Sequence, residues 1–476
     1  MTNDIQPPVQ QTNFLDRPVI STVPSVTFEK LLIAIILILA ILSRFIAVDK
    51  RVMSHDEVNH VVPAWDLYQG TGYAHDPVTH GPFQFHLLAA SYFIMGDSDF
   101  SARVPAALFS VAAVAFVMLA FPRYLGRKGA LLAGLFFLIS PFLLYYGRYT
   151  RNEAFIELFA VLMLYAVLRY LDKKDATSLI LLTVTTSLHF TTKETAYMYV
   201  AEMLIFLAVY LFIRLTKSSK WRSDNARMLF VIFSIIAIAL FAATFWFAIQ
   251  SASVAEVSED GTQFVTGEGS NNTVFLIASG VAFAIAAIGD LFYLVNNVGW
   301  KTIRNEASFD LIMVLGITVL PLLTALPLKI LGWYPINYNS FAEIARAFVV
   351  LFIISAVAVA LGFWWDRKKL LLHMGIFYAI FTIFYTTFFT NPRGFATGIV
   401  GSLGYWLVQQ SVERGTQPEY YYALIQLPIY EYLSIAGLVL AAFFGIKRLV
   451  QTTSQPEESD TPKPAKVPVL ALLLYW

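Results

Sequence analysis

Long apolar stretches, separated by short polar segments, dominate this chain. A helix needs about 20 apolar residues to cross the hydrocarbon core of a bilayer. One apolar stretch, FQFHLLAASYFIMG at 83–96, is too short for this and predicts an interfacial or re-entrant helix. The whole pattern predicts an all-α protein, a polytopic transmembrane helical bundle of about 12–13 spans. The apolar runs lie at 29–48, 103–121, 129–147, 154–171, 177–192, 196–214, 228–249, 273–295, 309–331, 342–365, 370–389 and 430–446.

Composition agrees with a membrane protein. Of the 476 residues, 58% are hydrophobic and 14% are charged, whereas a soluble domain carries about 25% charged residues. The net charge of +1 gives no reason to expect a nucleic-acid partner, and we expect none. The chain has no cysteine, which excludes disulfides, thiolate zinc sites and cysteine nucleophiles.

The transmembrane domain, expected over 29–450, has polar segments at both ends. Residues 1–28 lack the basic region and cleavage site of a signal peptide, and we expect a disordered cytoplasmic tail there. The Pro-containing stretch 451–466 is typical of a flexible linker. The apolar residues 467–476 are expected to begin a possible further span.

Lysine and arginine concentrate in alternate loops, such as RYLGRK at 123–128 and RLTKSSKWRSDNAR at 214–227. Basic loops of membrane proteins face the cytoplasm. We therefore expect a multi-pass protein of the cell membrane with a cytoplasmic N-terminus. Two large loops, 49–82 and 390–429, are then expected to face outward.

The first outward loop contains the densest group of ionisable residues. MSHDEVNH, at 53–60, places His55, a candidate substrate-binding residue, beside the adjacent carboxylates of Asp56 and Glu57. Ionisable groups at membrane boundaries are costly to bury and often functional. The ordinary alternative is that carboxylates cap helices and that Lys and Arg extend toward water. The next two outward turns, YYGRYTRNE and HFTTKETAY, add the candidate substrate-binding residues Arg148, Arg151, Glu153, Lys193 and Glu194.

Two kinds of chemistry suit this loop. Five of the seven histidines lie within 55–86, but His55–His60 and His75–His80 are five residues apart, which does not favour a helical zinc site. A divalent cation such as Mg²⁺ or Mn²⁺ held by Asp56 and Glu57 stays open. The other interpretation is general base catalysis by a carboxylate. If the leaving group is a phosphate, outward Arg and Lys residues would stabilise its charge.

The second outward loop is rich in aromatic residues. It contains GYWLVQQSVERGTQPEYYYALIQLPIYEY, in which Tyr420 and Tyr421 are candidates for contact with sugar rings. The alternative is an aromatic belt at the membrane interface.

The order of motifs along the chain is familiar. HDE, YAHDPVTHGPFQFHL, SARVPAALFS, LISPFLLYYGRYTRNE and TTKETAY resemble the GT-C superfamily of membrane glycosyltransferases. The nearest branch is protein O-mannosyltransferase-like and includes lipopolysaccharide galacturonosyltransferase-like domains. More narrowly, HGPFQFHL and RGTQPEYYYALIQLPIYE are similar to prokaryotic flippase-activity-associated proteins.

The resemblance implies an inverting enzyme that takes a sugar from a polyprenyl-phosphate donor. The acceptor would be a glycan, lipid or protein of the cell envelope. By the same resemblance, Asp56 is the candidate base and Glu57 assists it. The residues that the resemblance places at the carrier phosphate or the substrate cavity are Arg148, Arg151, Lys193 and His80.

Two other functions stay open. A flippase or transporter for a lipid-linked sugar would typically show internal repeats and ionisable groups near the membrane midplane. We find no such repeat in the sequence. A non-catalytic partner in an envelope assembly is the other alternative, since an inactive site can keep its residues.

Overall fold

The structure is a computed structural model that describes residues 13–20, 22–251, 255–257, 263–265, 273–336, 340–409, 417–452, 469 and 471–472. The predictions for residues 1–12 and for 453–466 of the linker lie outside the described residues, as does most of 467–476; residues 451–452, expected in the linker, belong to the last long helix.

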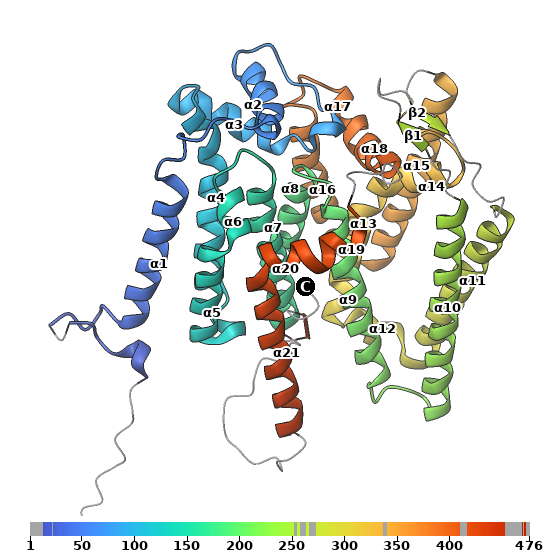
Figure 1. The fold of residues 1–476 in the computed structure, drawn as a ribbon. Helices are drawn as coiled ribbons and strands as arrows, with labels where there is room; N and C mark the ends of the chain where they lie inside the picture. Colours follow the sequence, from blue (N-terminus) through green and yellow to red (C-terminus); the bar gives the residue numbers. More distant parts are fainter. Residues whose placement is uncertain are drawn as a thin grey trace, which may run out of the picture.

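The described chain is a bundle of long helices (Figure 1), which confirms the predicted all-α membrane architecture. Each predicted apolar run coincides with a helix. Among the described residues, eight helices are long and apolar enough to cross a membrane, or nine if one bent pair counts as a single span, which is fewer than the predicted 12–13. The long helices are α1 (Phe28–Phe45), α4 (Asp99–Ala120), α5 (Pro122–Ile139), α7 (Glu153–Lys173), α8 (Ala176–Phe190), α9 (Ala196–Thr216), α10 (Asp224–Ser251), α11 (Thr273–Val298), α13 (Ala307–Val319), α15 (Phe341–Trp365), α16 (Arg367–Tyr385) and α21 (Tyr432–Thr452).

Short elements connect these helices. An antiparallel hairpin of β1 (Ala255–Val257) and β2 (Gln263–Val265) joins α10 to α11. Two short π-helices, η4 (Thr397–Gly401) and η5 (Tyr422–Gln426), interrupt the late part of the chain. The remaining elements are η1 (Phe14–Asp16), α2 (His55–Tyr68), η2 (Pro77–Thr79), α3 (Phe83–Met95), α6 (Pro141–Tyr146), α12 (Trp300–Arg304), η3 (Leu320–Thr324), α14 (Ala325–Ile330), α17 (Arg393–Ala396), α18 (Ser402–Gln409), α19 (Glu419–Tyr421) and α20 (Leu427–Tyr430).

The helices differ in how deeply they lie in the bundle. In the most apolar 18-residue segment of α7, 67% of the residues are buried inside the bundle, whereas the corresponding share is 6% in α11 and in α15. Lipid tails are as apolar as leucine, so helices in a membrane associate through close packing rather than through a hydrophobic force. Small residues of α4, among them Ala102, Ala106 and Ala113, are fully buried and allow this approach. Helix α7 therefore lies inside the bundle, and α10, α11 and α15 lie at its periphery.

The two kinds of loop lie at opposite ends of the bundle. Helices α2, α3, α17 and α18 and the hairpin β1–β2 lie across one end, at the top of Figure 1. At the other end, ion pairs such as Arg304–Asp366 and Arg214–Glu306 join the basic loops. The charge pattern of the sequence thus separates the two ends of the molecule.

Three segments are more ordered than expected. The first outward loop contains the helix α2, and the described part of the second, 390–409 and 417–429, is largely helical. Disorder was expected up to residue 28, but Asp16 pairs with Arg127, and Phe14 stacks on Phe28. Local capping and aromatic contacts stabilise these segments, and apolar periodicity does not reveal such contacts.

Candidate active site

Helix α2 begins inside the motif MSHDEVNH. Ser54 is its N-cap, and its hydroxyl accepts a hydrogen bond from the backbone N–H of Glu57. The carboxylate of Glu57 in turn accepts from the backbone N–H of Ser54, at 3.1 Å. This reciprocal arrangement is a capping box, which satisfies N–H groups at the start of a helix. The Ser54 hydroxyl also lies 2.5 Å from the Tyr149 hydroxyl, which joins α2 to the turn after α6.

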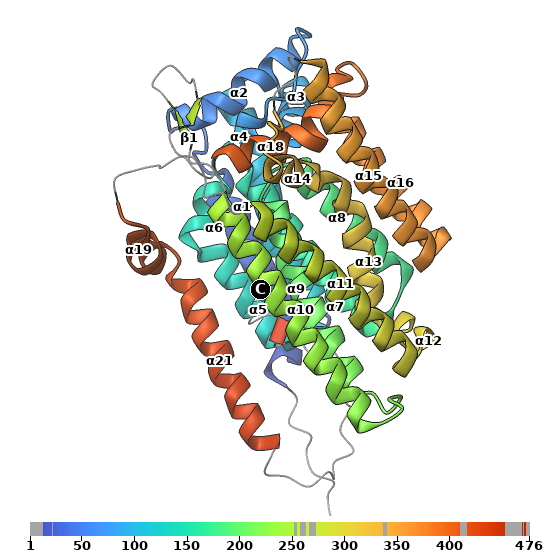
Figure 2. The ribbon, with the colours of Figure 1, turned by 90° about the vertical axis from the view of Figure 1, so that its right-hand side faces the viewer.

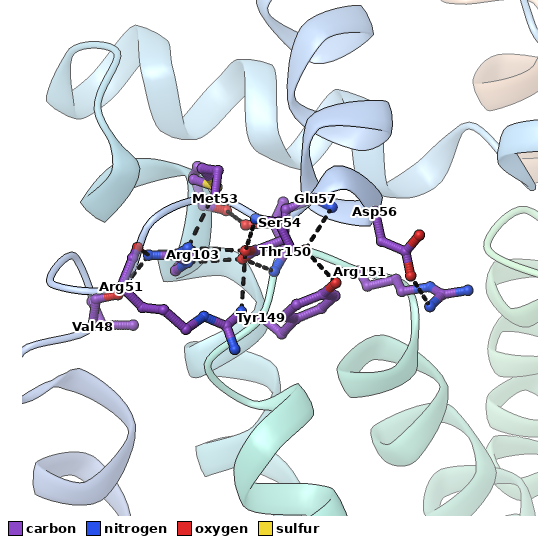
Figure 3. A network of polar contacts seen from close by, with 11 residues as sticks. Val48, Arg51, Met53, Ser54, Asp56, Glu57, Arg103, Tyr149, Thr150 and Arg151 are labelled. Atoms are coloured by element: carbon purple, nitrogen blue, oxygen red, sulfur yellow. Dashed lines mark hydrogen bonds and ion pairs between the residues drawn. The ribbon is translucent and has the colours of Figure 1, made fainter.

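Glu57 is the centre of a buried polar network (Figure 3). Arg103 of α4 donates two hydrogen bonds to its carboxylate, at 2.8 and 2.9 Å, and both side chains are fully buried. Arg51 and the backbone N–H of Thr150 donate at 3.1 Å each. With the bond from Ser54, five donors surround a carboxylate that offers about four lone-pair directions. Glu57 therefore has no free direction for a substrate.

The network also sets the protonation state of Glu57. Burial alone would raise the pKa of this carboxyl. The hydrogen bonds from Arg103 and from the backbone N–H groups of Thr150 and Ser54 outweigh burial, so the pKa of Glu57 lies below its ordinary value. The carboxylate is thus held in its charged form, as a fixed anchor for the start of α2.

Asp56 points away from this network. In Figure 3 its side chain lies toward Arg151, on the other side of the start of α2 from Arg103. Arg151 Nη1 donates to Asp56 Oδ2 at 2.8 Å, and about half of the Asp56 side chain is exposed. Successive residues of a helix point about 100° apart, which is why neighbouring carboxylates reach different surroundings. Asp56 therefore keeps an accessible carboxylate.

Arg148 does not lie with Arg151. Its guanidinium donates to the backbone carbonyls of Ser43 and Ile46 at 2.6 and 2.9 Å, and to that of Ala47 at 3.3 Å. These are carbonyls at the end of α1, where a helix leaves its last C=O groups without partners. The contacts favour a structural role for Arg148 at that helix end.

His80 and Glu194 form a pair on the opposite side of the site. His80 Nδ1 lies 2.7 Å from Glu194 Oε2, and the imidazole stacks on the Trp406 ring with centroids 4.9 Å apart. The residue after His80 is Gly81, whose N–H donates to the carbonyl of Thr192. A Cβ on Gly81 would lie 2.3 Å from the Thr191 carbonyl oxygen. The glycine in HGPFQ is therefore needed for this close approach.

Lys193 and Glu153 form a third pair. Lys193 Nζ donates to Glu153 Oε1 at 2.7 Å, and both side chains are largely buried. Arg151 Nε lies 3.6 Å from the same carboxylate oxygen. Arg151 thus lies between Asp56 and Glu153, so the three clusters that the sequence places in separate turns meet in one charged row.

A cavity of about 350 Å³ opens beside this row. Its charged and polar lining comes from the two cations and the His80–Glu194 pair. Residues of α9 and α18 make the rest of its wall mostly apolar. It can therefore hold an anionic group at one part of its wall and an apolar chain at another. The lining residues are His80, Arg151, Lys193, Glu194, Thr195, Tyr197, Met198, Leu403, Trp406 and Leu407.

The remaining histidines do not gather into a metal site. His75 Nδ1 lies 2.9 Å from Thr397 Oγ1, and burial lowers the pKa of His75 to about 3. Burial likewise lowers the pKa of His60 to about 3. In the part of the chain that the structure describes, no group of three or more His, Asp or Glu residues could hold a metal ion. Glu57 is occupied by Arg51 and Arg103 and points away from Asp56, so the two carboxylates do not converge on one divalent cation.

Of the predicted site residues, only His80, Arg151, Lys193 and Glu194 line the cavity. Asp56 lies beside it, through its contact with Arg151. Tyr420 and Tyr421 belong to α19 and are exposed, and neither lines the cavity. His55 is exposed at the start of α2, with Nδ1 3.5 Å from the Asn59 amide. Whether these residues contact a substrate stays a prediction.

Two residues that organise the site, Arg103 and Trp406, were not predicted from the sequence. Arg103 stands in the motif SARVPAALFS at the start of an apolar run, and an arginine in such a run is costly unless it is paired. That position was the available signal. Trp406 lies far from His80 in the sequence, and no local pattern links the two.

The fold and this site define a multi-pass helical membrane protein with a charged cavity at one end of its bundle. A family model described as dolichyl-phosphate-mannose-protein mannosyltransferase matches residues 79–247, which is less than half of the chain. The match confirms the resemblance to protein O-mannosyltransferase-like members of the GT-C superfamily. It includes His80, Arg151 and Lys193 but not Asp56, and the narrower likeness to flippase-associated proteins stays a prediction.

Solved structures give weaker likenesses. An oligosaccharyltransferase from Archaeoglobus fulgidus, solved with zinc and sulfate, is 14% identical with a TM-score of 0.35; the match covers 83% of this chain and 54% of that chain. The chain therefore spans about half the length of that protein. ArnT from Cupriavidus metallidurans, solved with undecaprenyl phosphate, is 13% identical with a TM-score of 0.33, and the match covers 80% of this chain and 77% of that one. A search of curated proteins finds no match to this chain.

Proposed function

We propose that this protein is a membrane glycosyltransferase. It transfers a sugar from a polyprenyl-phosphate donor to an acceptor on the extracytoplasmic side of the cell membrane, with inversion at the anomeric carbon. The family match supports the reaction class and a lipid-phosphate donor. One observation carries the assignment of the site: Arg151 contacts the accessible carboxylate of Asp56 and also lines the cavity.

In this proposal, the carrier phosphate binds at Arg151 and Lys193. Charge-assisted hydrogen bonds from such cations are strong and favour the charge that develops on a leaving phosphate. The carrier's isoprenoid chain lies along the apolar wall formed by Tyr197, Met198 and Leu403.

Asp56 acts as the general base. It takes the proton of the acceptor hydroxyl while the hydroxyl oxygen bonds to the anomeric carbon. The bond from that carbon to the phosphate oxygen breaks in the same step, and polyprenyl phosphate leaves. Glu57 has all its directions occupied, so its part is to hold α2 and thereby to position Asp56.

The test is transfer of labelled sugar from synthetic polyprenyl-phosphate donors by purified protein in liposomes that contain membrane extract. Asp56→Asn should lower turnover by about 10²–10⁴-fold, as expected for loss of a general base. The matched control is Asp49→Asn, because Asp49 is an exposed carboxylate of the same loop with no hydrogen bond or ion pair among the described residues. It should leave turnover unchanged, and both variants are run with and without a chelator.

Normal turnover by well-folded Asp56→Asn would remove Asp56 as the base. Absence of transfer by the wild-type protein from every donor, together with movement of the carrier across the liposome membrane, would replace the transferase with a flippase.

A further inference from the structure

A second opening leads away from the active-site cavity between the transmembrane helices. A crevice of about 440 Å³ lies between α5, α7, α9 and α21. It shares Glu157 and Tyr199 with a smaller cavity of about 300 Å³. That cavity shares Lys193 and Thr195 with the active-site cavity. Three adjacent cavities thus connect the charged row to the edge of the bundle, where α21 stands in Figure 2.

Glu157 is the unusual residue of this crevice. Glu157 is 9% exposed, and neither of its carboxyl oxygens has a hydrogen-bond partner among the described residues. The charge of Arg44 and the hydroxyl of Ser110 lie nearby. However, Arg44 donates to the backbone carbonyls of Phe137 and Leu138. A buried carboxyl without a partner is costly, so Glu157 calls for a ligand that supplies a hydrogen bond.

A second carboxyl lines the same crevice. Glu431 lies at the 91° bend between Leu424–Tyr430 and Tyr432–Phe443, and its Oε1 is buried without a hydrogen-bond partner among the described residues. Its Oε2 accepts from the Ser434 hydroxyl at 3.3 Å. No Lys or Arg is among the residues that line this crevice. The lining therefore offers a phosphate no cation, whereas Arg151 and Lys193 line the active-site cavity.

We infer that this crevice binds the head group of a neutral membrane lipid that carries a free hydroxyl, and that this lipid is the acceptor of the transfer. The inference rests on the proposed function. A hydroxyl both donates and accepts, so it can satisfy Glu157 in either protonation state, which an ammonium group cannot. The apolar walls, with Phe136, Phe137 and Leu433, suit the lipid tails.

The two lipids are separated because cations line one cavity and none lines the other. The phosphate-bearing donor occupies the cavity with Arg151 and Lys193, and the neutral acceptor enters between α7 and α21. The cavity between them, lined by Glu153 and Glu157, is the path by which the acceptor hydroxyl reaches the donor sugar.

The first test measures binding alone. Full-length protein in phosphatidylcholine liposomes is labelled with a photoreactive diacylglycerol, or with a photoreactive phosphatidic acid that has the same acyl chains. We expect diacylglycerol to label peptides of α5, α7 and α21 several-fold more strongly. Glu157→Leu should abolish this preference and Glu157→Gln should keep it, because an amide still donates and accepts. Equal labelling by the two lipids, or undiminished labelling of Glu157→Leu, overturns the inference.

Controls separate binding from folding and from catalysis. Glu202→Leu removes an exposed carboxyl of α9 that does not line the crevice, and it should label like the wild type. Glu431→Leu gives a second variant at the crevice in case Glu157→Leu does not fold. If the wild-type protein and Glu157→Leu transfer sugar to lipid equally, the acceptor site is refuted and the proposed function stands. If labelling depends on Glu157 but no sugar is transferred, the lipid site stands and the transferase assignment fails.

Discussion

Replacement of Arg103 by methionine should destabilise the polar end of the bundle strongly. Methionine has a similar length and can fill much of the space, so the change mainly removes the guanidinium. The variant would lose two hydrogen bonds to the Glu57 carboxylate and two more to the carbonyls of Val48 and Arg51, at 2.8 and 2.9 Å.

The size of the effect follows from burial. Both partners of the Arg103–Glu57 pair are fully buried, and removal of one partner of such a pair costs about 3–5 kcal/mol because the other charge stays buried. Arg51 and two backbone N–H groups still contact Glu57, which places the expected loss toward the lower end of that range. In the double variant Arg103→Met, Glu57→Leu, no charge is left behind, so it should be more stable than Arg103→Met.

The pH dependence gives the same reasoning a second test. The pKa of Glu57 is lowered in the folded wild type. Its contribution to stability is therefore present above the ordinary glutamate pKa of about 4.5 and is lost as pH falls through the folded value. In Arg103→Met the buried carboxyl can protonate more readily. The deficit of the variant should therefore be largest at neutral pH and smaller near pH 4.

The assay is thermal unfolding of detergent-purified protein, followed by tryptophan fluorescence at pH 7 and pH 4. The wild type, both single variants and the double variant form a double-mutant cycle. An Arg103→Met variant as stable as the wild type at pH 7, or a deficit that does not change with pH, would refute the buried pair as the anchor of α2.

Three further results are expected. Gly81→Ala should disturb the packing of the His80 loop on Thr191 and increase its proteolysis, whereas Gly375→Ala, with open space around it, should not. Burial lowers the pKa of His75 to about 3, so the unfolded state binds more protons than the folded state below about pH 6.5. The free energy of unfolding should therefore fall by up to about 1.4 kcal/mol for each pH unit below that value. It should fall less steeply in His75→Asn, which thermal unfolding at several pH values would show. Lys193→Met should raise the KM for the polyprenyl-phosphate donor by about 10–100-fold through loss of a charge-assisted hydrogen bond, measured at saturating acceptor; an unchanged KM would place the phosphate elsewhere.

The helices could be predicted from the sequence because a long apolar run in a membrane must satisfy its backbone hydrogen bonds internally. For the part of the chain that the structure describes, the number of spans was predicted too high, since some runs, such as the one at α8, form helices shorter than a span. The meeting of Arg151, Glu153, Lys193, Glu194 and His80 also followed, since turns on one side of a bundle of neighbouring helices lie close together. Their individual partners did not follow, because the direction of a side chain depends on the packing of its helix.

The motif SHDE shows what was misread. Its serine and glutamate are three residues apart, which is the signature of a capping box. The two carboxylates were instead interpreted as one acidic pair. The helix start separates them: Glu57 turns inward to Arg103 and Asp56 outward to Arg151. An arginine at the start of an apolar run was the available sign that a buried acid must exist nearby.

The joining of the early histidine loop to the late chain has a consequence for biogenesis. His75 pairs with Thr397 across 322 positions, and His80 stacks on Trp406. The Arg103–Glu57 anchor, in contrast, uses partners that are 46 positions apart. Since chains fold from the N-terminus as they are synthesised, the anchor can form early, while the wall of the cavity must wait for α18 to insert. A chain arrested before that point would have Asp56 near Arg151 but would lack the part of the cavity wall that α18 supplies.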